Sequence, residues 1–553
     1  MPIFRPSRLR HRGPRVLPAV LAIAIFLAFA LCAAAQGPNA SGPDPSAAVS
    51  SPNGRILLVL PFDNRSTQPS LEWIREAAAE LLSSRFASAG FSPVNREDRV
   101  YALDHLGLPE GFHPSRASSI KIAETLDADA IIVGSFTTDG VNIVAEASIV
   151  DVSRLRMNPP VDARGKLTDM IAVFDTLAWK LTRQLEPSFN GAQETFVAAG
   201  AGLRLDAFEQ YIRGITEPDQ SERLGHLNQA VKLSPDFSPA WMALGREYYL
   251  NQQYDQAAAA FDRVGRNDPE ALEAGFYRGL SLVFSGDYPK AEQAFADVAR
   301  ILPLADVVNN QGVAVSRQGH NAIALFRQAI AADPDAADYH FNLAVSLRHY
   351  NQDAEAISEL TQCLHLHPND SEAQALLAAW KSPTPPSATA DPDAHPDPLE
   401  RIARNFDEVA FRQAAQMLDQ MNDARTAQLS PRDCALRLAA RAQDYLNRGL
   451  LLEAERLYLS AQAADNSVAQ AHAGLAQVRE QTGDTEAARS EATRAIHLQP
   501  SAPAYLVLGR LDLAAGNLTK ATAEAGQALK LDPANQPAQE LLRQILTRNG
   551  QHT

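Results

Sequence analysis

Cysteine is scarce in this sequence, with three residues in 553: Cys32, Cys363 and Cys434. Two widely spaced cysteines beyond the N-terminal segment cannot form the several bridges of a disulfide scaffold, although a single Cys363–Cys434 bridge stays open. Aromatic residues are also few, at 7%, whereas hydrophobic residues make up 46%. This composition is globular, and an alanine- and leucine-rich chain with few aromatics favours helices. A chain of this length is expected to form two or three domains.

Positive charge is in deficit. The formal net charge is -15, and the first 35 residues hold five arginines and no acid, so the remainder carries -15 - 5 = -20. An acidic chain repels phosphate backbones, so the sequence predicts no nucleic-acid partner. The charge is expected to serve solubility.

Motifs that signal catalysis or metal binding are missing. The sequence has no H-E-x-x-H, no G-x-S-x-G and no Walker motif, and Gly200-Ala-Gly202 lacks the third glycine of a dinucleotide loop. The cluster Cys363-x-His365-x-His367 places alternate residues about 200° apart on a helix, which disfavours a shared metal ion. We therefore predict no catalytic residue, cofactor or metal, although a Ser–His–Asp triad assembled from distant residues stays open.

An export signal is predicted at the N-terminus. Basic residues precede an apolar run over residues 16–35, which ends in three alanines before Gln36, the small-residue pattern of a cleavage site. The run is also about long enough for an uncleaved membrane anchor, and a lipoprotein signal at Cys32 is disfavoured by the bulky Leu31 before it. We expect residues 1–35 to be a signal peptide or tether, residues 36–53 a flexible linker, and the protein to be exported to the periplasm or cell envelope of a bacterium.

An α/β domain is predicted over residues 54–190. A continuous apolar run at residues 56–60 indicates a buried strand, and a helical pattern over residues 71–89 ends at Gly90. Asp139-Gly140 joins two further strands in the manner of a hairpin. The remaining expected elements are a strand at 91–94 and helices at 96–106, 116–126 and 168–185.

The stretches ILLVLPFDN, AAELLSSRF and LDADAIIVGSFTTDGVNIVAEASIVDV resemble a domain of bacterial envelope proteins. The pattern is similar to the N-terminal domain of TolB and to the core of curli-secretion and flagellar outer-membrane lipoproteins, over residues 55–185. This resemblance implies an envelope location and a role in protein assembly, and it carries over no catalytic residue.

A repeat dominates the remainder. Trp241, Leu244, Gly245, Tyr248, Ala257, Phe261 and Pro269 occupy the positions of the tetratricopeptide pattern W-x2-L-G-x2-Y…A-x3-F…P. The 24 residues from Gly245 to Pro269 recur between Gly279 and Pro303, Ala344 and Pro368, Ala476 and Pro500, and Gly509 and Pro533, and from Ala442 to Asn466. Small residues let paired helices approach closely, and repeats must stack to bury their apolar faces.

These spacings predict an all-α solenoid of tetratricopeptide repeats in two blocks. The first block, residues 204–381, has five repeats that end at Pro235, Pro269, Pro303, Pro334 and Pro368. A proline-rich linker spans 382–398. The second block, residues 399–548, begins with a helical pattern containing Ile402 and Phe406, continues with three repeats, and ends in a capping helix at 536–548.

The first helices of stacked repeats are expected to line a concave groove that binds proteins or peptides. The predicted groove residues are apolar, aromatic or basic, a composition favoured at binding hot spots: Met242, Arg246, Tyr249, Phe276, Leu280, Phe284, Phe341, Arg348 and His349. The lysine–asparagine clamp for chaperone C-termini is absent from these positions, which disfavours that ligand. Packing of the aromatics between repeats is the alternative.

The sequence thus favours an exported scaffold or adaptor over an enzyme. The alternative is an enzyme, or a self-assembling secretion component, whose activity lies in residues 54–190.

Overall fold

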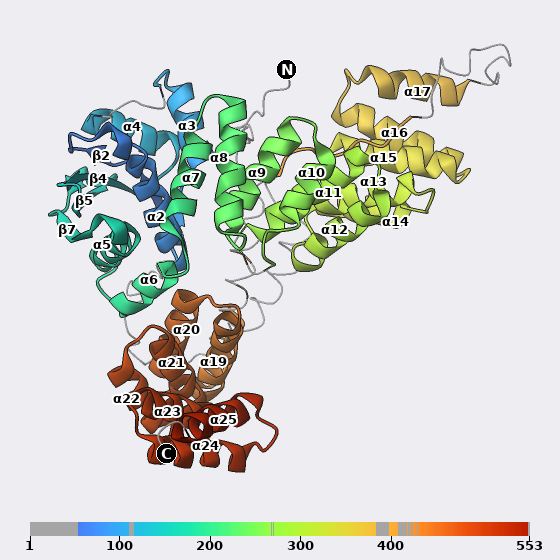
Figure 1. Cartoon of the computed structure of the whole chain (residues 1–553). Coiled ribbons are helices and arrows are strands. Elements are labelled where there is room, and N and C mark those ends of the chain that lie inside the picture. Colours follow the sequence, from blue (N-terminus) through green and yellow to red (C-terminus); the bar gives the residue numbers. More distant parts are fainter. Residues whose placement is uncertain are drawn as a thin grey trace, which may run out of the picture.

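The computed structural model describes residues 54–109, 115–266, 268, 270–382, 398–406, 417, 421, 424–426 and 428–550. The predicted signal segment and the linker to residue 53 lie outside the described residues. Among the helices that are described, none combines the length and the apolar character needed to cross a membrane. Figure 1 shows a sheet-containing unit beside a long helical block, with a second helical block below it.

The N-terminal unit is built on a mixed sheet. Its seven strands within the described chain have the order β3 (Ser92–Pro93), β1 (Ile56–Val59), β4 (Ala130–Thr138), β5 (Asn142–Asp151) and β6 (Arg156–Met157). β2 (Asp63–Asn64) pairs with β4, and β7 (Val161–Lys166) pairs with β5. β1 is parallel to β3 and β4, and β4 forms the predicted antiparallel hairpin with β5, in which Gly140 adopts a positive φ of 90°.

Helices cover both faces of this sheet, so the apolar run of β1 is buried on both sides. Leu57 and Val59 pack with α2 (Ile74–Ser88) and α5 (Met170–Leu185), whereas Leu58 and Leu60 pack with α3 (Arg96–His105) and α4 (Arg116–Thr125). Successive strand residues point to opposite faces, so a continuous apolar run is required here. The predicted α/β unit is confirmed; β2, β6 and β7 were not predicted.

The first repeat block consists of five antiparallel helix pairs and a final helix. The first four helices are α7 (Leu205–Thr216), α8 (Gln220–Leu233), α9 (Ser238–Leu250) and α10 (Tyr254–Phe261). They are followed by α11 (Ala271–Ser285), α12 (Tyr288–Ile301), α13 (Ala305–Arg317), α14 (Ile323–Ala332), α15 (Ala337–His349), α16 (Asp353–Leu366) and α17 (Ser371–Lys381). The predicted all-α solenoid is confirmed.

Glycine at one position of the first helix brings the two helices of a pair together. A Cβ added at Gly245 would lie 2.7 Å from the ring of Phe261, and one at Gly279 would lie 2.7 Å from the ring of Phe295. Both rings are buried, at 2% and 0% exposure. The small residue therefore makes room for the large one, as the repeat pattern predicts.

The second block has three helix pairs and a capping helix. They are α19 (Pro431–Asn447) with α20 (Leu451–Ala464), α21 (Ala469–Gln481) with α22 (Thr485–Leu498), α23 (Ala502–Ala514) with α24 (Leu518–Leu531), and α25 (Gln536–Gly550). The expectation that this block starts with a helix at residue 399 is wrong for residues 399–406. These residues are not helical, and they lie on the first block because its side chains bind their backbone, as described below.

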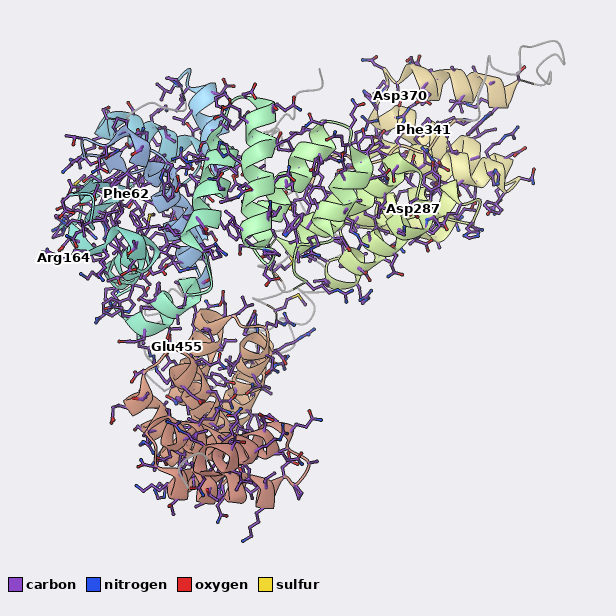
Figure 2. The ribbon with its side chains drawn as sticks, in the orientation of Figure 1. Phe62, Arg164, Asp287, Phe341, Asp370 and Glu455 are labelled. Atoms are coloured by element: carbon purple, nitrogen blue, oxygen red, sulfur yellow. The ribbon has the colours of Figure 1, made fainter. Side chains whose placement is uncertain are left out.

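Both blocks also contact the N-terminal unit. Arg246 of α9 pairs with Glu97 of α3 at 2.7 Å and with Glu273 of α11 at 2.6 Å. In the second block, both carboxylate oxygens of Glu455 of α20 accept from the backbone N–H of Ala192, at 3.2 and 3.3 Å, just before α6 (Gln193–Gly200). Figure 2 shows Glu455 at this junction, and Glu455 also pairs with Arg479 at 2.6 Å.

Carboxyl groups with raised pKa values lie around the junction between α2, α3 and the first block. Burial and the neighbouring Glu76 raise the pKa of Glu80 to about 7. Burial raises the pKa of Glu270 to about 8, although the charge of Arg246 opposes the rise. The other charged groups that act on these two carboxyls are Arg96, Glu97, Arg99, Asp268 and Glu273.

Candidate functional site

A non-helical stretch of the chain crosses the first helices of the block-one pairs. We call residues 398–406 the groove segment, and we call the side of the block formed by α11, α13, α15 and the start of α17 the inner face. Hydrogen bonds, ion pairs and ring contacts join the groove segment to each of these helices. This is the face that the sequence assigned to the groove, and its occupant is the protein's own chain.

Two asparagines of the inner face bind the backbone of the groove segment. Asn342 of α15 donates to the carbonyl of Arg401 at 2.7 Å and accepts from the N–H of the same residue at 2.6 Å. Asn310 of α13 does the same for Ala403, at 2.8 Å to the carbonyl and 2.9 Å from the N–H. Each side-chain amide thus stands where a neighbouring strand would stand in a sheet.

A third asparagine connects the other two. Asn309 accepts from Asn342 at 2.8 Å, and donates to the Arg401 carbonyl at 3.2 Å and to Asn310 at 3.3 Å. All three asparagines are buried, with exposures of 0% or 1%. Buried amides need partners, and here the backbone of the groove segment supplies several of them. Because these bonds go to main-chain atoms, they set an extended backbone without choosing the residue type.

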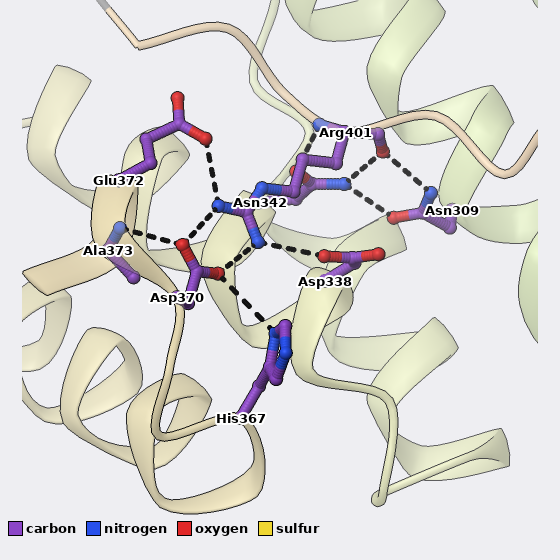
Figure 3. Close-up of polar contacts among 8 residues, drawn as sticks. All are labelled: Asn309, Asp338, Asn342, His367, Asp370, Glu372, Ala373 and Arg401. Atoms are coloured by element: carbon purple, nitrogen blue, oxygen red, sulfur yellow. Dashed lines mark hydrogen bonds and ion pairs between the residues drawn. The ribbon is translucent and has the colours of Figure 1, made fainter.

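The side chain of Arg401 enters an acidic pocket at the end of the inner face. Its guanidinium binds both carboxylate oxygens of Asp370, at 2.5 and 3.0 Å, and single oxygens of Asp338 at 2.9 Å and Glu372 at 2.8 Å (Figure 3). The guanidinium carbon lies 3.6 Å from the centre of the Phe341 ring, and Figure 2 shows Phe341 and Asp370 close together in this part of the block. A planar fork over an aromatic face is an arrangement that lysine cannot reproduce.

The electrostatics of the pocket favour the charged forms of Asp370 and Arg401. Hydrogen bonding to Arg401 lowers the pKa of Asp370, and Arg401 itself has a pKa above its usual value, because its hydrogen bonds to the three carboxylates outweigh burial. Asp370 also accepts from the N–H of Ala373 at 3.0 Å and so caps α17. Three carboxylates surround one cation, so the pocket without Arg401 would hold an excess of negative charge.

The residues on either side of Arg401 make further contacts. Glu400 accepts from the Arg317 guanidinium at 3.1 Å and from the Ser316 hydroxyl. Ile402 and Phe406 pack on the apolar core of the block. The Phe406 ring lies 5.7 Å from that of Phe276. The groove segment is therefore held by its backbone, by two charged side chains and by apolar anchors.

The structure divides the predicted groove residues into three groups. Met242, Phe276, Leu280 and Phe341 are buried; Arg246, Tyr249 and Phe284 are half-buried; and Arg348 and His349 are exposed. Phe276, Phe284 and Phe341 are brought together with the groove segment, Phe284 through Arg404, which lies 5.4 Å from its ring. Arg246 instead joins α3 to α11. That these residues bind a partner stays a prediction.

The asparagines were missed by the sequence analysis, although a signal existed. Asn310 and Asn342 each stand two residues before the small residue of a first helix, Gly312 and Ala344. When an asparagine recurs at the same position in two successive repeats, the two side-chain amides line up along one face of the solenoid. The predicted groove residues include aromatic neighbours such as Phe341, one residue away, which point to an adjacent part of the same surface.

The side chains of the cysteine–histidine cluster do not lie on one side of the helix. Cys363 is buried with a pKa that burial raises to about 11, whereas His365 and His367 are exposed. Within the described part of the chain, no group of three or more His, Cys, Asp or Glu side chains is arranged to hold a metal ion.

Family models described as tetratricopeptide repeat match residues 316–379, and residues 226–306 and 439–503. The chain therefore carries tetratricopeptide repeats in both blocks, as its spacing predicts. Among curated proteins, it is 26% identical over 154 residues to anaphase-promoting complex subunit 6 of Arabidopsis thaliana, covering 26% of this chain and 28% of that protein. The match thus spans well under a third of that relative's length.

Two solved structures are similar to parts of this chain. MamA is 15% identical with a TM-score of 0.27, over 29% of this chain and 96% of that one. YrrB, described as a tetratricopeptide-repeat protein with an unusual peptide-binding site, is 16% identical with a TM-score of 0.28, over 36% of this chain and 98% of that one.

Proposed function

We propose that this protein is an exported scaffold of the bacterial cell envelope that holds extended segments of partner proteins on its repeat blocks. One observation carries the proposal: the inner face of the first block binds a stretch of extended polypeptide through amides directed at its main chain. A face that binds backbone suits many protein segments, and stacked repeats are a common way to present such a surface.

The location in the envelope rests on the sequence. A basic stretch, an apolar run and a small-residue site over residues 1–35 support export, and the resemblance of residues 55–185 to envelope domains supports the destination. Cell fractionation and N-terminal sequencing of the purified protein test this part. A protein that stays in the cytoplasm with its first residues intact would show that the export proposal is wrong.

The scaffold role is tested by site-specific photocrosslinking in isolated envelopes. One variant carries the photoreactive residue in place of Phe284 on α11, which faces the groove segment, and a matched variant carries it in place of the exposed Gln293 on α12. We expect the Phe284 position to crosslink to a segment of another protein, identified by mass spectrometry, and the Gln293 position not to. Equal capture from both positions would mean that the inner face is not the working surface.

The alternative of an enzymatic N-terminal unit finds no specific support among the described residues. Burial raises the pKa of Asp175 to about 6, but this carboxylate is fully buried and pairs with Arg85 at 2.7 Å. Glu80, whose pKa is also raised, lies beside Glu76 and Arg99 at the junction with the first block. Both arrangements are typical of structural ion-pair networks.

A further inference from the structure

The groove segment resembles a bound ligand more than a part of the fold. It forms neither helix nor strand, none of its residues is fully buried, and Leu399, Arg404 and Asn405 are exposed. It is held on a surface made by other residues, through backbone hydrogen bonds, two charged side chains and two partly buried apolar side chains that pack on that surface from outside. The segment can therefore leave the inner face without opening the apolar core of a repeat.

We propose that the inner face of the first block is a receptor for extended protein segments that carry an arginine preceded by an acid and followed by an apolar residue, and that the groove segment is a resident copy of this motif which a partner must displace. The proposal rests on the proposed function, because it names the ligand that the scaffold would bind. The motif is defined by the observed contacts of Glu400, Arg401 and Ile402.

Charge complementarity selects the arginine. Asp338, Asp370 and Glu372 all bind the Arg401 guanidinium, and no other cation among the described residues makes an ion pair with Asp370 except the distant His367, at 4.0 Å. A partner without a cation at this position would leave three carboxylates facing each other. The site selects arginine over lysine, because only a guanidinium can bind both oxygens of Asp370 and lie flat on the Phe341 ring.

The second selective position is the acid. The Arg317 guanidinium binds the Glu400 carboxylate at 3.1 Å and the Glu400 carbonyl at 3.1 Å. The Arg317 side chain is 21% exposed and that of Glu400 is 9% exposed, so this pair is largely shielded from water. Arg317 thus binds the acid, and the acidic pocket binds the residue after it. A ligand in which an arginine directly follows an acid can occupy both places at once.

The linker before the groove segment explains how the segment can occupy the inner face and still be displaced by a partner. Residues 382–398 join α17 to the groove segment and are rich in proline and polar residues. A tethered ligand competes at an effective concentration of about millimolar, so a partner must bind well or be abundant to replace it. Weakening the resident copy should then raise the apparent affinity for every external ligand of the same motif.

The test uses a fluorescent synthetic peptide with the sequence of residues 398–406, PLERIARNF, titrated with the full chain by fluorescence anisotropy. The chain variants are Arg401→Ala, which weakens the resident copy and leaves the receptor intact, and Arg401→Lys, which keeps the charge and loses the fork. Arg327→Ala is the matched control, because Arg327 of α14 is exposed and pairs with Glu355 of α16 at 3.0 Å, away from the inner face. Circular dichroism confirms that each variant is folded.

We expect the probe to bind Arg401→Ala at least about tenfold more tightly than the unchanged chain or the Arg327→Ala control, with Arg401→Lys between them. A probe with alanine in place of its arginine should bind Arg401→Ala about tenfold more weakly than the arginine probe. Adding Asn310→Leu and Asn342→Leu to Arg401→Ala should abolish binding of both probes.

Each other outcome overturns the proposal in a distinguishable way. If both probes bind Arg401→Ala equally, the inner face is a peptide receptor without arginine selectivity, and the proposed function survives alone. If no probe binds any folded variant, the proposed function of this face fails as well. If light scattering shows that Arg401→Ala converts a dimer into a monomer, the segment is exchanged between two copies and is not a resident competitor.

Discussion

Replacing Asn342 with leucine should release the groove segment while leaving the repeat intact. Leucine is close to asparagine in shape and suits the interior of α15, so the helix should persist. The variant loses the two hydrogen bonds to Arg401, at 2.6 and 2.7 Å, and the bond to Asn309 at 2.8 Å. At about 1 kcal/mol for each of the two segment bonds, the segment is destabilised by about 2 kcal/mol, which corresponds to a roughly 30-fold larger open population.

Hydrogen exchange at single-residue resolution measures this opening. The backbone N–H groups of Arg401 and Ala403 are held by Asn342 and Asn310, so both should be protected in the unchanged chain. In Asn342→Leu, we expect both to exchange about 30-fold faster, because the segment opens as one strip, with the amides of α15 unchanged. Asn228→Leu is the control, since the exposed Asn228 bonds the Leu224 carbonyl of its own helix at 2.8 Å. Equal exchange in the unchanged chain and Asn342→Leu would refute the role of the amide ladder.

Three further predictions concern the packing of the helix pairs and the contacts of the two blocks with the N-terminal unit. Gly279→Ala should lower stability by about 1–3 kcal/mol in a denaturant titration because its Cβ would lie 2.7 Å from a buried ring, whereas Gly225→Ala, with nothing within 4 Å, should raise it by up to about 1 kcal/mol. Burial raises the pKa of Glu80 from 4.5 to about 7 and that of Glu270 from 4.5 to about 8, so between these values the folded state holds more protons than the unfolded state. Stability should fall as pH rises from about 4.5 to about 8, and Glu80→Gln with Glu270→Gln should flatten that slope in thermal scans. Glu455→Ala leaves the buried Arg479 unpaired, at a cost of about 3–5 kcal/mol. The second block should then unfold separately from the N-terminal unit in calorimetry, and a single coincident transition would contradict this.

The sequence predicts most of the fold because its signals are local and repeated. The pairing of a small residue such as Gly279 with a large one such as Phe295, and the proline that ends most helix pairs, recur along the chain, so one irregular repeat does not obscure the pattern. The apolar run of β1 and the Asp139-Gly140 turn are equally local. Strand β7 was not predicted because every second residue of Val161–Lys166 is charged and few of the others are apolar, so the stretch has no apolar run, and its place is set by pairing with β5.

The candidate site could be predicted only in part, since it depends on contacts between distant residues. Ile402 and Phe406 have the spacing of a helix, and local propensity alone assigns them to the second block. Their conformation is decided by Asn342, 59 residues before Arg401, and by Asn310, 93 residues before Ala403. Hydrogen bonds that satisfy buried amides outweigh a weak helical preference, and no window of the sequence contains both partners.

The groove segment also bears on how the two blocks are held. The second block follows the segment in the chain, and it contacts the N-terminal unit through Glu455 and Leu452 of α20. The second block is therefore restrained at two places: by the groove segment bound to the inner face, which precedes the block in the chain, and by the contact of α20 with the residue before α6. Displacing the segment by a partner removes the first restraint and leaves the second, so the second block should stay on the N-terminal unit and the Glu455 contact should persist when a ligand binds the inner face. Loss of both together would require a coupling that the described contacts do not provide.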